Sequence, residues 1–278
     1  MAIGRYLTIG LNYVDPARYD GWDGELTACE NDARDIAAMT GFTGTTLLRG
    51  QATSQAVLQE LQKAAKDLKS GDLFVVGYSG HGSNVEDVTE DEPDKRDETW
   101  CLYDRMMVDD ELQAMWSHFR AGVRILVLSD SCHSASMTKN MPFGLGGELA
   151  AMAGIDKAAA GRPRGKLMPA KVRVTIAIRD KALYDSLQYV AGPATKVEVQ
   201  ASVLLISGCQ DDELSYDGDQ NGVFTGQLKK VWGDGKFPGN YEEFHRQVLD
   251  GVKPRQNPNY FFTGAPNAAF QKQKPFAV

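Results

Sequence analysis

The chain has 278 residues, a formal net charge of −7 and a hydrophobic content of 42%. This composition is typical of a globular protein, and the length fits one large domain or a domain with a long insertion. The acidic balance argues against a nucleic-acid partner and favours a basic peptide. The apolar run at residues 6–11 has no basic flank or small-residue cleavage site, and no run could span a bilayer. We therefore expect no signal peptide and no membrane partner.

The cysteines are widely separated and form no CxxC pair, which excludes a zinc or redox motif of that kind. Dispersed thiols in an acidic protein usually remain reduced, so we expect a cytoplasmic protein. The cysteines are Cys29, Cys101, Cys132 and Cys209.

Strand and helix patterns alternate through the first half of the chain. Apolar, β-rich runs predict strands, and apolar residues at helical spacing predict the helices between them. The predicted strands are residues 5–13, 45–48, 72–78 and 124–129, and the helices are residues 29–39, 54–69 and 109–119. This alternation predicts an α/β fold with a mostly parallel sheet and helices on both faces.

The second half is less regular. Residues 141–170 are rich in Gly, Ala, Pro and basic side chains, which is typical of a loop or processing segment. Beyond it, we predict helices at residues 179–190, 223–232 and 241–252, and strands at residues 202–207 and 260–263. The expected organisation is residues 1–140, a flexible basic linker at 141–175, and residues 176–278.

Two of the buried strands run into residues that carry chemistry. His81 lies between two glycines just after one strand, and Cys132 follows the next long strand. The carboxyl ends of parallel strands meet at one edge of a sheet, so these side chains are expected to be neighbours. A cysteine nucleophile needs such a base nearby to take its proton.

Four motifs together resemble those of the metacaspases, caspase-like cysteine peptidases, and we expect the bacterial type. Tyr-Ser-Gly-His-Gly at residues 78–82 and Asp-Ser-Cys-His-Ser at 130–134 are similar to the family's two catalytic segments. Cys-Glu-Asn-Asp at 29–32 is similar to its C-x-N-D segment, and Ser-Gly-Cys-Gln-Asp-Asp at 207–212 to a stretch of its small subunit. The motifs occur in the family's order.

The resemblance implies a caspase-like fold with a central, mostly parallel six-stranded sheet flanked by helices on both faces. Residues 1–140 would correspond to the large subunit (p20) and residues 176–278 to the small subunit (p10), together forming one domain. It also implies Cys132 and His81 as the catalytic dyad, with the backbone N–H groups of Gly82 and Cys132 as oxyanion donors. His133 is a competing base, but alternation along an extended segment would direct it away from Cys132.

The expected substrate is a peptide with Arg or Lys at P1, the residue whose carbonyl is attacked. Two carboxylates converging on one pocket would bind a cation, and Asp130 precedes the nucleophile by two residues while Asp32 opens a helix. In metacaspases, the positions that match Cys29, Asp32, Ser79 and Asp130 line this S1 pocket. An alternative for Asp32 is compensation of the helix N-terminus.

Calcium activation, known in many metacaspases, is expected to be absent or weak here. Asp97, Asp109 and Asp110 match three of the acidic calcium positions, but Lys139 stands at the fourth, where a cation opposes a metal that binds carboxylates. Residues 217–222 match the opening of an EF-hand loop, but its twelfth position is Leu228, so a turn near the substrate cleft is expected. We expect the chemistry itself to require no cofactor.

The linker contains the basic residues Arg162, Arg164, Lys166 and Lys171. An enzyme that cleaves after Arg or Lys could cut itself there, so we treat these residues as a processing loop. An ordinary surface loop is the alternative, since exposed loops are nicked readily in any case.

The predicted function is therefore a cysteine endopeptidase that cleaves after Arg or Lys through an acyl-enzyme. Two alternatives remain: a catalytically silent caspase-like interaction module, and a legumain- or gingipain-like peptidase, which would lack the C-x-N-D segment. By resemblance we expect a monomer that acts on protein or peptide substrates.

Overall fold

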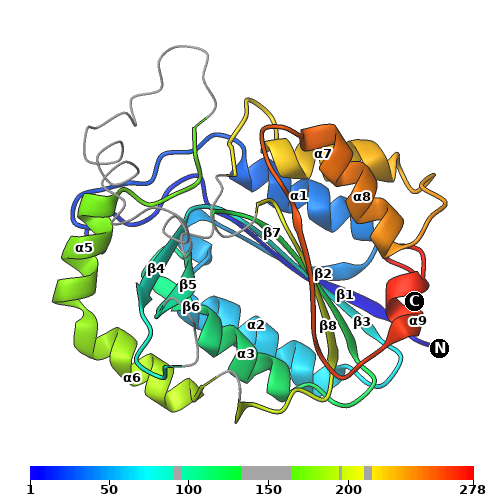
Figure 1. Ribbon diagram of the computed structural model, residues 1–278, viewed down its shortest axis with the longest axis horizontal. Coiled ribbons are helices and arrows are strands. Elements are labelled where there is room, and N and C mark those ends of the chain that lie inside the picture. The colour runs from blue at the N-terminus through cyan, green and yellow to red at the C-terminus, as the bar shows by residue number, and fades with distance from the viewer. Residues whose placement is uncertain (91–94, 133–163, 194–195, 210–214) are drawn as a thin grey trace.

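The computed structural model describes residues 1–90, 95–132, 164–193, 196–209 and 215–278, and its centre is a six-stranded sheet (Figure 1). The strand order is β2-β1-β3-β7-β8-β9, parallel except for the antiparallel edge strand β9. The strands are β1 (Gly4–Gly10), β2 (Thr43–Leu48), β3 (Leu73–Ser79), β7 (Arg124–Asp130), β8 (Ser202–Ser207) and β9 (Asn259–Gly264). The predicted six-stranded, mostly parallel sheet is confirmed.

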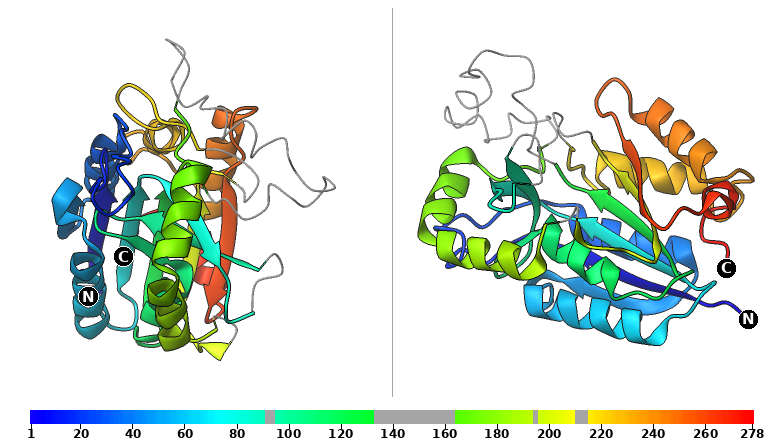
Figure 2. Two further views of the ribbon diagram at one scale, coloured as in Figure 1. Left: turned by 90° about the vertical axis from the view of Figure 1, so that its left-hand side faces the viewer. Right: turned by 60° about the horizontal axis from the view of Figure 1, so that its bottom comes forward.

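Helices cover both faces of this sheet, also as predicted (Figures 1 and 2). One layer contains α1 (Cys29–Thr40), α7 (Val223–Trp232) and α8 (Tyr241–Val252), with the short α9 (Ala268–Lys272) near the C-terminus. The other contains α2 (Ser54–Asp67) and α3 (Asp109–Ser117). Each layer encloses its own apolar cluster against the sheet. The central strand β3 is buried along its whole length, as its continuous apolar sequence predicts.

A second sheet, which the sequence patterns did not predict, follows β3. It is antiparallel, in the order β4-β5-β6, and consists of β4 (Gly82–Glu86), β5 (Arg96–Cys101) and β6 (Met106–Val108). Its strands are short and the sequence between β4 and β5 is polar and acidic, so no apolar periodicity marks these strands. Val85 and Met106 nevertheless bury a third apolar cluster beneath it.

The helical segment after the linker differs from the prediction in extent. The helix predicted at residues 179–190 is confirmed as α6 (Lys181–Ala191), and a further helix that was not predicted, α5 (Ala170–Arg179), precedes it; both pack beside the small sheet (Figure 1). The linker predicted at residues 141–175 is therefore wrong at its C-terminal end, since residues 170–175 are helical. Ile176 and Tyr184 join the third cluster, and this burial outweighs the weak helical pattern of the linker sequence.

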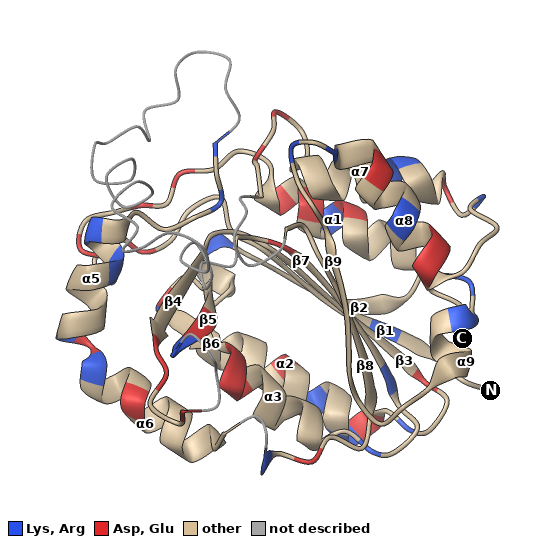
Figure 3. Ribbon diagram, in the orientation of Figure 1, with Lys and Arg blue, Asp and Glu red and all other residues tan. Residues whose placement is uncertain are grey.

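Charged residues are interspersed over the helices and loops, while the central strands are largely uncharged (Figure 3). Within the described residues, every helix is too short or too polar to cross a lipid bilayer.

Candidate active site

The carboxyl edge of the large sheet gathers the residues that the sequence analysis singled out. β1, β3 and β7 are paired in register, so that Gly10 lies beside Ser79 and Ser79 beside Asp130. His81 and Cys132 each follow two residues after these strand ends. The parallel pairing thus brings two segments 51 positions apart in sequence to one edge, as predicted.

An extended stretch of the chain itself, residues 164–168, runs through this edge. Lys166 N–H donates to the Ser215 carbonyl at 2.8 Å, and Asp217 N–H donates to the Arg164 carbonyl at 2.7 Å. Farther along, Met168 N–H donates to the Gly82 carbonyl at 3.0 Å. We call this stretch the inserted segment; its backbone is held both before and after Lys166.

The main-chain carbonyl of Lys166 accepts two hydrogen bonds from the predicted oxyanion donors. Gly82 N–H lies 2.9 Å and Cys132 N–H 3.3 Å from its oxygen. A β-carbon at position 82 would lie 1.7 Å from the Cys132 carbonyl oxygen, so only glycine allows these two strand-end segments to approach so closely. The two N–H groups form a cradle that could stabilise an oxyanion at this carbon.

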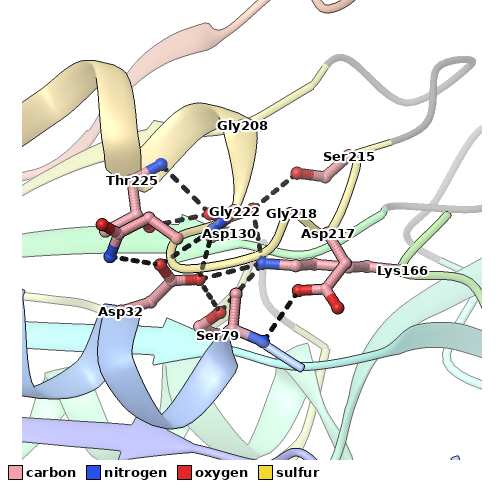
Figure 4. A network of polar contacts seen from close by, with 12 residues as sticks. Asp32, Ser79, Asp130, Lys166, Gly208, Ser215, Asp217, Gly218, Gly222 and Thr225 are labelled. Carbon is pink, nitrogen blue, oxygen red and sulfur yellow. Dashed lines mark hydrogen bonds and ion pairs between the residues drawn. The ribbon is translucent and has the colours of Figure 1, made fainter. Parts of the chain in front are cut away.

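The Lys166 side chain fills a buried acidic pocket (Figure 4). Its Nζ lies 3.1 Å from Asp32 Oδ2, 3.0 Å from Asp130 Oδ1 and 2.9 Å from Ser79 Oγ, and none of the three charged side chains is exposed. The three donors of the Lys166 ammonium group are thus matched by three oxygen atoms.

Neutral groups from the α7 side of the sheet hold the two carboxylates in place. Asp130 accepts hydrogen bonds from Ser215 Oγ at 2.6 Å and from Thr225 N–H and Oγ1 at 3.1 and 2.7 Å. Asp32 accepts from Asn221 Nδ2 at 3.0 Å and from Gly222 N–H at 2.9 Å. Each charge is thus satisfied by donors besides the lysine, which keeps the pocket acidic when a ligand leaves.

Burial and charge oppose each other in setting the pKa values of this pocket. Burial alone would lower the pKa of Lys166, but the carboxylates of Asp130 and Asp32 hold it well above its usual value. Burial raises the pKa of Asp32 to about 6, although the Lys166 charge lowers it. Burial also raises the pKa of the Cys29 thiol, against the Lys166 charge. Cys29 therefore borders the pocket as a neutral thiol.

The predicted dyad is electrically neutral in this arrangement. Burial raises the pKa of the Cys132 thiol, and contact with the Cys209 thiol adds to the effect. Burial lowers the pKa of His81 to about 3, although the Gly24 carbonyl, 3.2 Å from Nε2, opposes it. Among the described residues, no hydrogen bond joins Cys132 to His81: Cys132 Sγ accepts from Ser215 N–H at 3.0 Å, and His81 Nδ1 is buried without a partner. A thiol in this state would have to lose its proton before it could act as a nucleophile.

The residues proposed for calcium lie away from this pocket, on the small sheet. Asp97 lies in β5, and Asp109 and Asp110 begin α3 directly after β6, at the same end of the paired strands. Within the described ranges, no group of three or more His, Cys, Asp or Glu side chains is placed to hold a metal ion. Lys139 lies outside the described residues, and the absent or weak calcium activation stays a prediction.

Several residues of the site were missed by sequence analysis or assigned elsewhere. Lys166 was predicted as part of a processing loop, not as the occupant of the pocket, while Arg162 and His133 lie outside the described residues. Asp217, from the EF-hand-like sequence, accepts hydrogen bonds from Thr27 and Ala28 just before α1, so residues 217–222 form a turn beside the pocket, as predicted. Ser215 and Thr225 belong to no recognised motif, and Asn221 and Gly222 belong only to the EF-hand-like run, so no sequence pattern indicated that they hold the carboxylates.

Comparisons with known proteins agree with the arrangement. The family described as Caspase domain (Peptidase_C14) matches residues 7–275. Metacaspase-1A of Aspergillus oryzae is 27% identical over 290 residues, covering 91% of this chain and 65% of that protein. Metacaspase-1 of Schizosaccharomyces pombe is 29% identical over 283 residues, covering 89% and 63%. The chain thus spans slightly less than two thirds of the length of these relatives.

A solved structure is similar over almost the whole chain. The crystal structure of protein GSU0716 from Geobacter sulfurreducens superposes with a TM-score of 0.86 and 44% sequence identity, covering 99% of both chains. This similarity supports the arrangement of both sheets and their helices.

The wall of the pocket predicts the effect of one substitution. A β-carbon at position 222 would lie 2.5 Å from Lys166 Nζ and 2.4 Å from Asp130 Oδ2, too close for either to stay in place. Gly222→Ala should expel Lys166, and hydrogen exchange of residues 164–168 should accelerate at least about ten-fold, as local opening becomes favourable.

Gly226→Ala is the matched control, because a β-carbon there meets only Asn221 Cβ, at an ordinary 3.5 Å. Equal hydrogen-exchange rates of residues 164–168 in the two variants would show that Lys166 does not occupy the pocket in solution.

Proposed function

The chain belongs to the caspase-domain family of the C14 peptidases and is metacaspase-like, and from that premise we propose that it is a cysteine endopeptidase that cleaves after Lys or Arg. One observation carries the proposal: Lys166 lies in the site as a substrate would, with its side chain between two carboxylates and its carbonyl between two N–H donors. Family membership favours this interpretation over a legumain- or gingipain-like peptidase.

The geometry supports an acyl-transfer mechanism. Cys132 Sγ attacks the carbonyl carbon of the P1 residue while its proton passes to the neutral His81. The N–H groups of Gly82 and Cys132 stabilise the oxyanion, and His81 then protonates the leaving amine. Water hydrolyses the thioester and releases the peptide with a P1 carboxylate. Asp32, Asp130 and Ser79 bind the P1 cation, with Cys29 beside them, and a P1 carboxylate would be repelled.

The first test is hydrolysis of matched peptides with Lys, Arg or Asp at P1, with and without calcium. We expect cleavage after Lys and Arg alone. Cys132→Ala should lose about a thousand-fold or more in kcat/KM, and His81→Ala about 10²–10⁴-fold. Comparison of the hydrolysis rates with and without calcium tests the prediction that calcium activation is absent or weak.

Cys209→Ala serves as the thiol control, since it removes a neighbouring sulfur and leaves the nucleophile. Absence of hydrolysis, together with failure of a Lys-containing electrophile to alkylate Cys132, would contradict the proposal and favour the silent interaction module.

The pKa of Asp32 predicts how P1 recognition depends on pH. Asp32 takes up a proton as the pH falls through about 6, and the pocket then loses one negative charge. A bound cation lowers this pKa. The pKa of Asp32 in an empty pocket is therefore no lower than its pKa in an occupied one. The KM for a P1-Lys peptide should therefore begin to rise above pH 6, as the empty pocket takes up its proton, and should be about ten-fold higher or more below pH 6, since a charge-assisted hydrogen bond contributes about 1.5–3 kcal/mol.

A peptide with norleucine at P1 is the control, because it carries no charge and its KM should change little over the same range. In Asp32→Asn the KM rise should disappear; if it persists, another group is responsible for the titration.

Self-processing at the Lys166–Leu167 bond follows from the same arrangement. That bond lies where a scissile bond would lie, and β8, on the C-terminal side, pairs along its whole length with β7 on the N-terminal side. Met168 is also buried, next to Ser83 of β4. Incubation should therefore yield fragments 1–166 and 167–278 on a denaturing gel that elute together under native conditions.

The cut is assigned by sequencing the new amino terminus, which should begin at Leu167. Lys166→Gln and Cys132→Ala should both remain intact, whereas Lys171→Gln should be cut as usual. A wild-type chain that hydrolyses peptides but stays whole would contradict self-processing and leave the peptidase proposal standing.

A further inference from the structure

The inserted segment shows more of a substrate's path than the P1 pocket. The Lys166 carbonyl lies between the oxyanion donors and its side chain fills the acidic pocket, so Lys166 occupies the P1 position. Counting back along the chain, Gly165 is at P2 and Arg164 at P3. This register comes from the backbone bonds and does not depend on what Arg164 contacts.

We propose that Glu25 forms a second acidic subsite, which selects Arg or Lys at P3. The preferred substrates would then carry basic residues at both P1 and P3. This inference rests on the proposed peptidase function and deepens it by defining the class of peptide.

The first observation is the extended pairing of the inserted segment. Gly165 forms an antiparallel bridge with Tyr216, with Lys166 N–H bonded to Ser215 and the Arg164 carbonyl bonded to Asp217. In an extended chain, side chains two residues apart lie on the same face. A P3 side chain is therefore directed to the same side as the P1 side chain, where the chain's acidic groups are found. Any peptide that pairs with residues 215–217 in this way presents its P3 residue at the same place.

The second observation is the contact made by Arg164. Its Nη1 donates to Glu25 Oε2 and to the Glu25 main-chain carbonyl, both at 3.0 Å. Arg164 Nη1 thus binds both the charged carboxylate and the main-chain carbonyl of Glu25. A lysine ammonium carries the same charge, whereas glutamine could reach the carbonyl but gains no charge pairing.

The position of Glu25 is fixed by the same turn that binds the peptide backbone. The Asp217 carboxylate accepts hydrogen bonds from Thr27 N–H at 2.7 Å and Ala28 N–H at 3.1 Å, while Asp217 N–H binds the P3 carbonyl. The loop that carries Glu25 is thereby joined to the strand-like turn that aligns the substrate. The bonds from Thr27 and Ala28 to the Asp217 carboxylate do not involve Arg164, so this anchor of the Glu25 loop does not depend on the inserted segment.

The two subsites differ in strength for a physical reason. Lys166 is fully buried, whereas the side chains of Arg164 and Glu25 are 39% and 51% exposed. Water and salt screen an exposed pair, so the P3 preference should be about two- to five-fold and should shrink at high ionic strength. The P1 residue would determine whether a peptide is cleaved, and the P3 residue would determine how fast the cleavable peptides react relative to one another.

The test compares peptides that share Gly-Lys at P2 and P1 and carry Arg, Gln or Glu at P3. The wild-type chain should give the highest kcat/KM with Arg and the lowest with Glu. Glu25→Gln should reduce this ranking, and Glu25→Lys should reverse it. Glu198→Lys is the charge-matched control, because Glu198 is exposed and lies before β8, at the opposite edge of the sheet; it should keep the wild-type ranking.

Two outcomes would overturn the inference in distinguishable ways. Equal cleavage of the three peptides by the wild-type chain would mean that the Glu25–Arg164 pair only tethers the inserted segment, and the peptidase proposal would stand. Failure to cleave any of them would remove the proposed function and this subsite with it. A ranking that survives in Glu25→Lys would assign P3 selection to another residue.

Discussion

The burial of one ammonium group between two carboxylates is the interaction on which this site depends. Asp32 and Asp130 come from α1 and β7, and both are completely buried beside Lys166. Charges at such depth are tolerated only when they are paired and hydrogen-bonded. The surrounding donors, Ser215, Thr225 and Gly222, come from a part of the chain about ninety or more residues away. The pocket therefore links the first and last thirds of the sequence.

Burial governs the protonation state of the predicted dyad. Cys132 and His81 are buried at the sheet edge along which the inserted segment runs, and burial favours the neutral form of each. A neutral thiol is a weak nucleophile, so Cys132 is not activated in this arrangement, in which the chain's own Lys166 fills the pocket. Displacement of the segment would admit water and change the proton balance of both groups.

The backbone of the inserted segment explains why its register is so well defined. It pairs with residues 215–217 before Lys166 and with Gly82 after it, so the carbonyl between them has little freedom. After Lys166 the chain becomes structural, since Met168 is buried and α5 begins at Ala170. Residues 164–166 are thus held by side-chain contacts and by pairing with residues 215–217, whereas the residues after Lys166 belong to the fold itself.

Much of the fold and of the site followed from local sequence. Continuous apolar runs such as residues 73–78 can only be strands buried on both faces, and the residues that end them were predicted to meet. His81, Cys132, Gly82, Asp32 and Asp130 were found in this way, because strand ends and motifs are local features. The small sheet was missed because its strands are short and polar, and their burial depends on α5 and α6, which are more than sixty residues away.

Tertiary structure alone decided which residue occupies the pocket. In sequence, Lys166 is one of several basic residues in an irregular segment, and no periodic pattern distinguishes it from Arg164 or Lys171. Its role arises from pairing with residues 215–217 and from a buried cavity whose charge is opposite to its own, both of which exist only once distant segments are packed together. The sequence by itself determined the sheet and indicated the dyad and the acidity of the pocket; long-range packing determined the occupant, because an ion pair is selected by distance in space and not by separation along the chain.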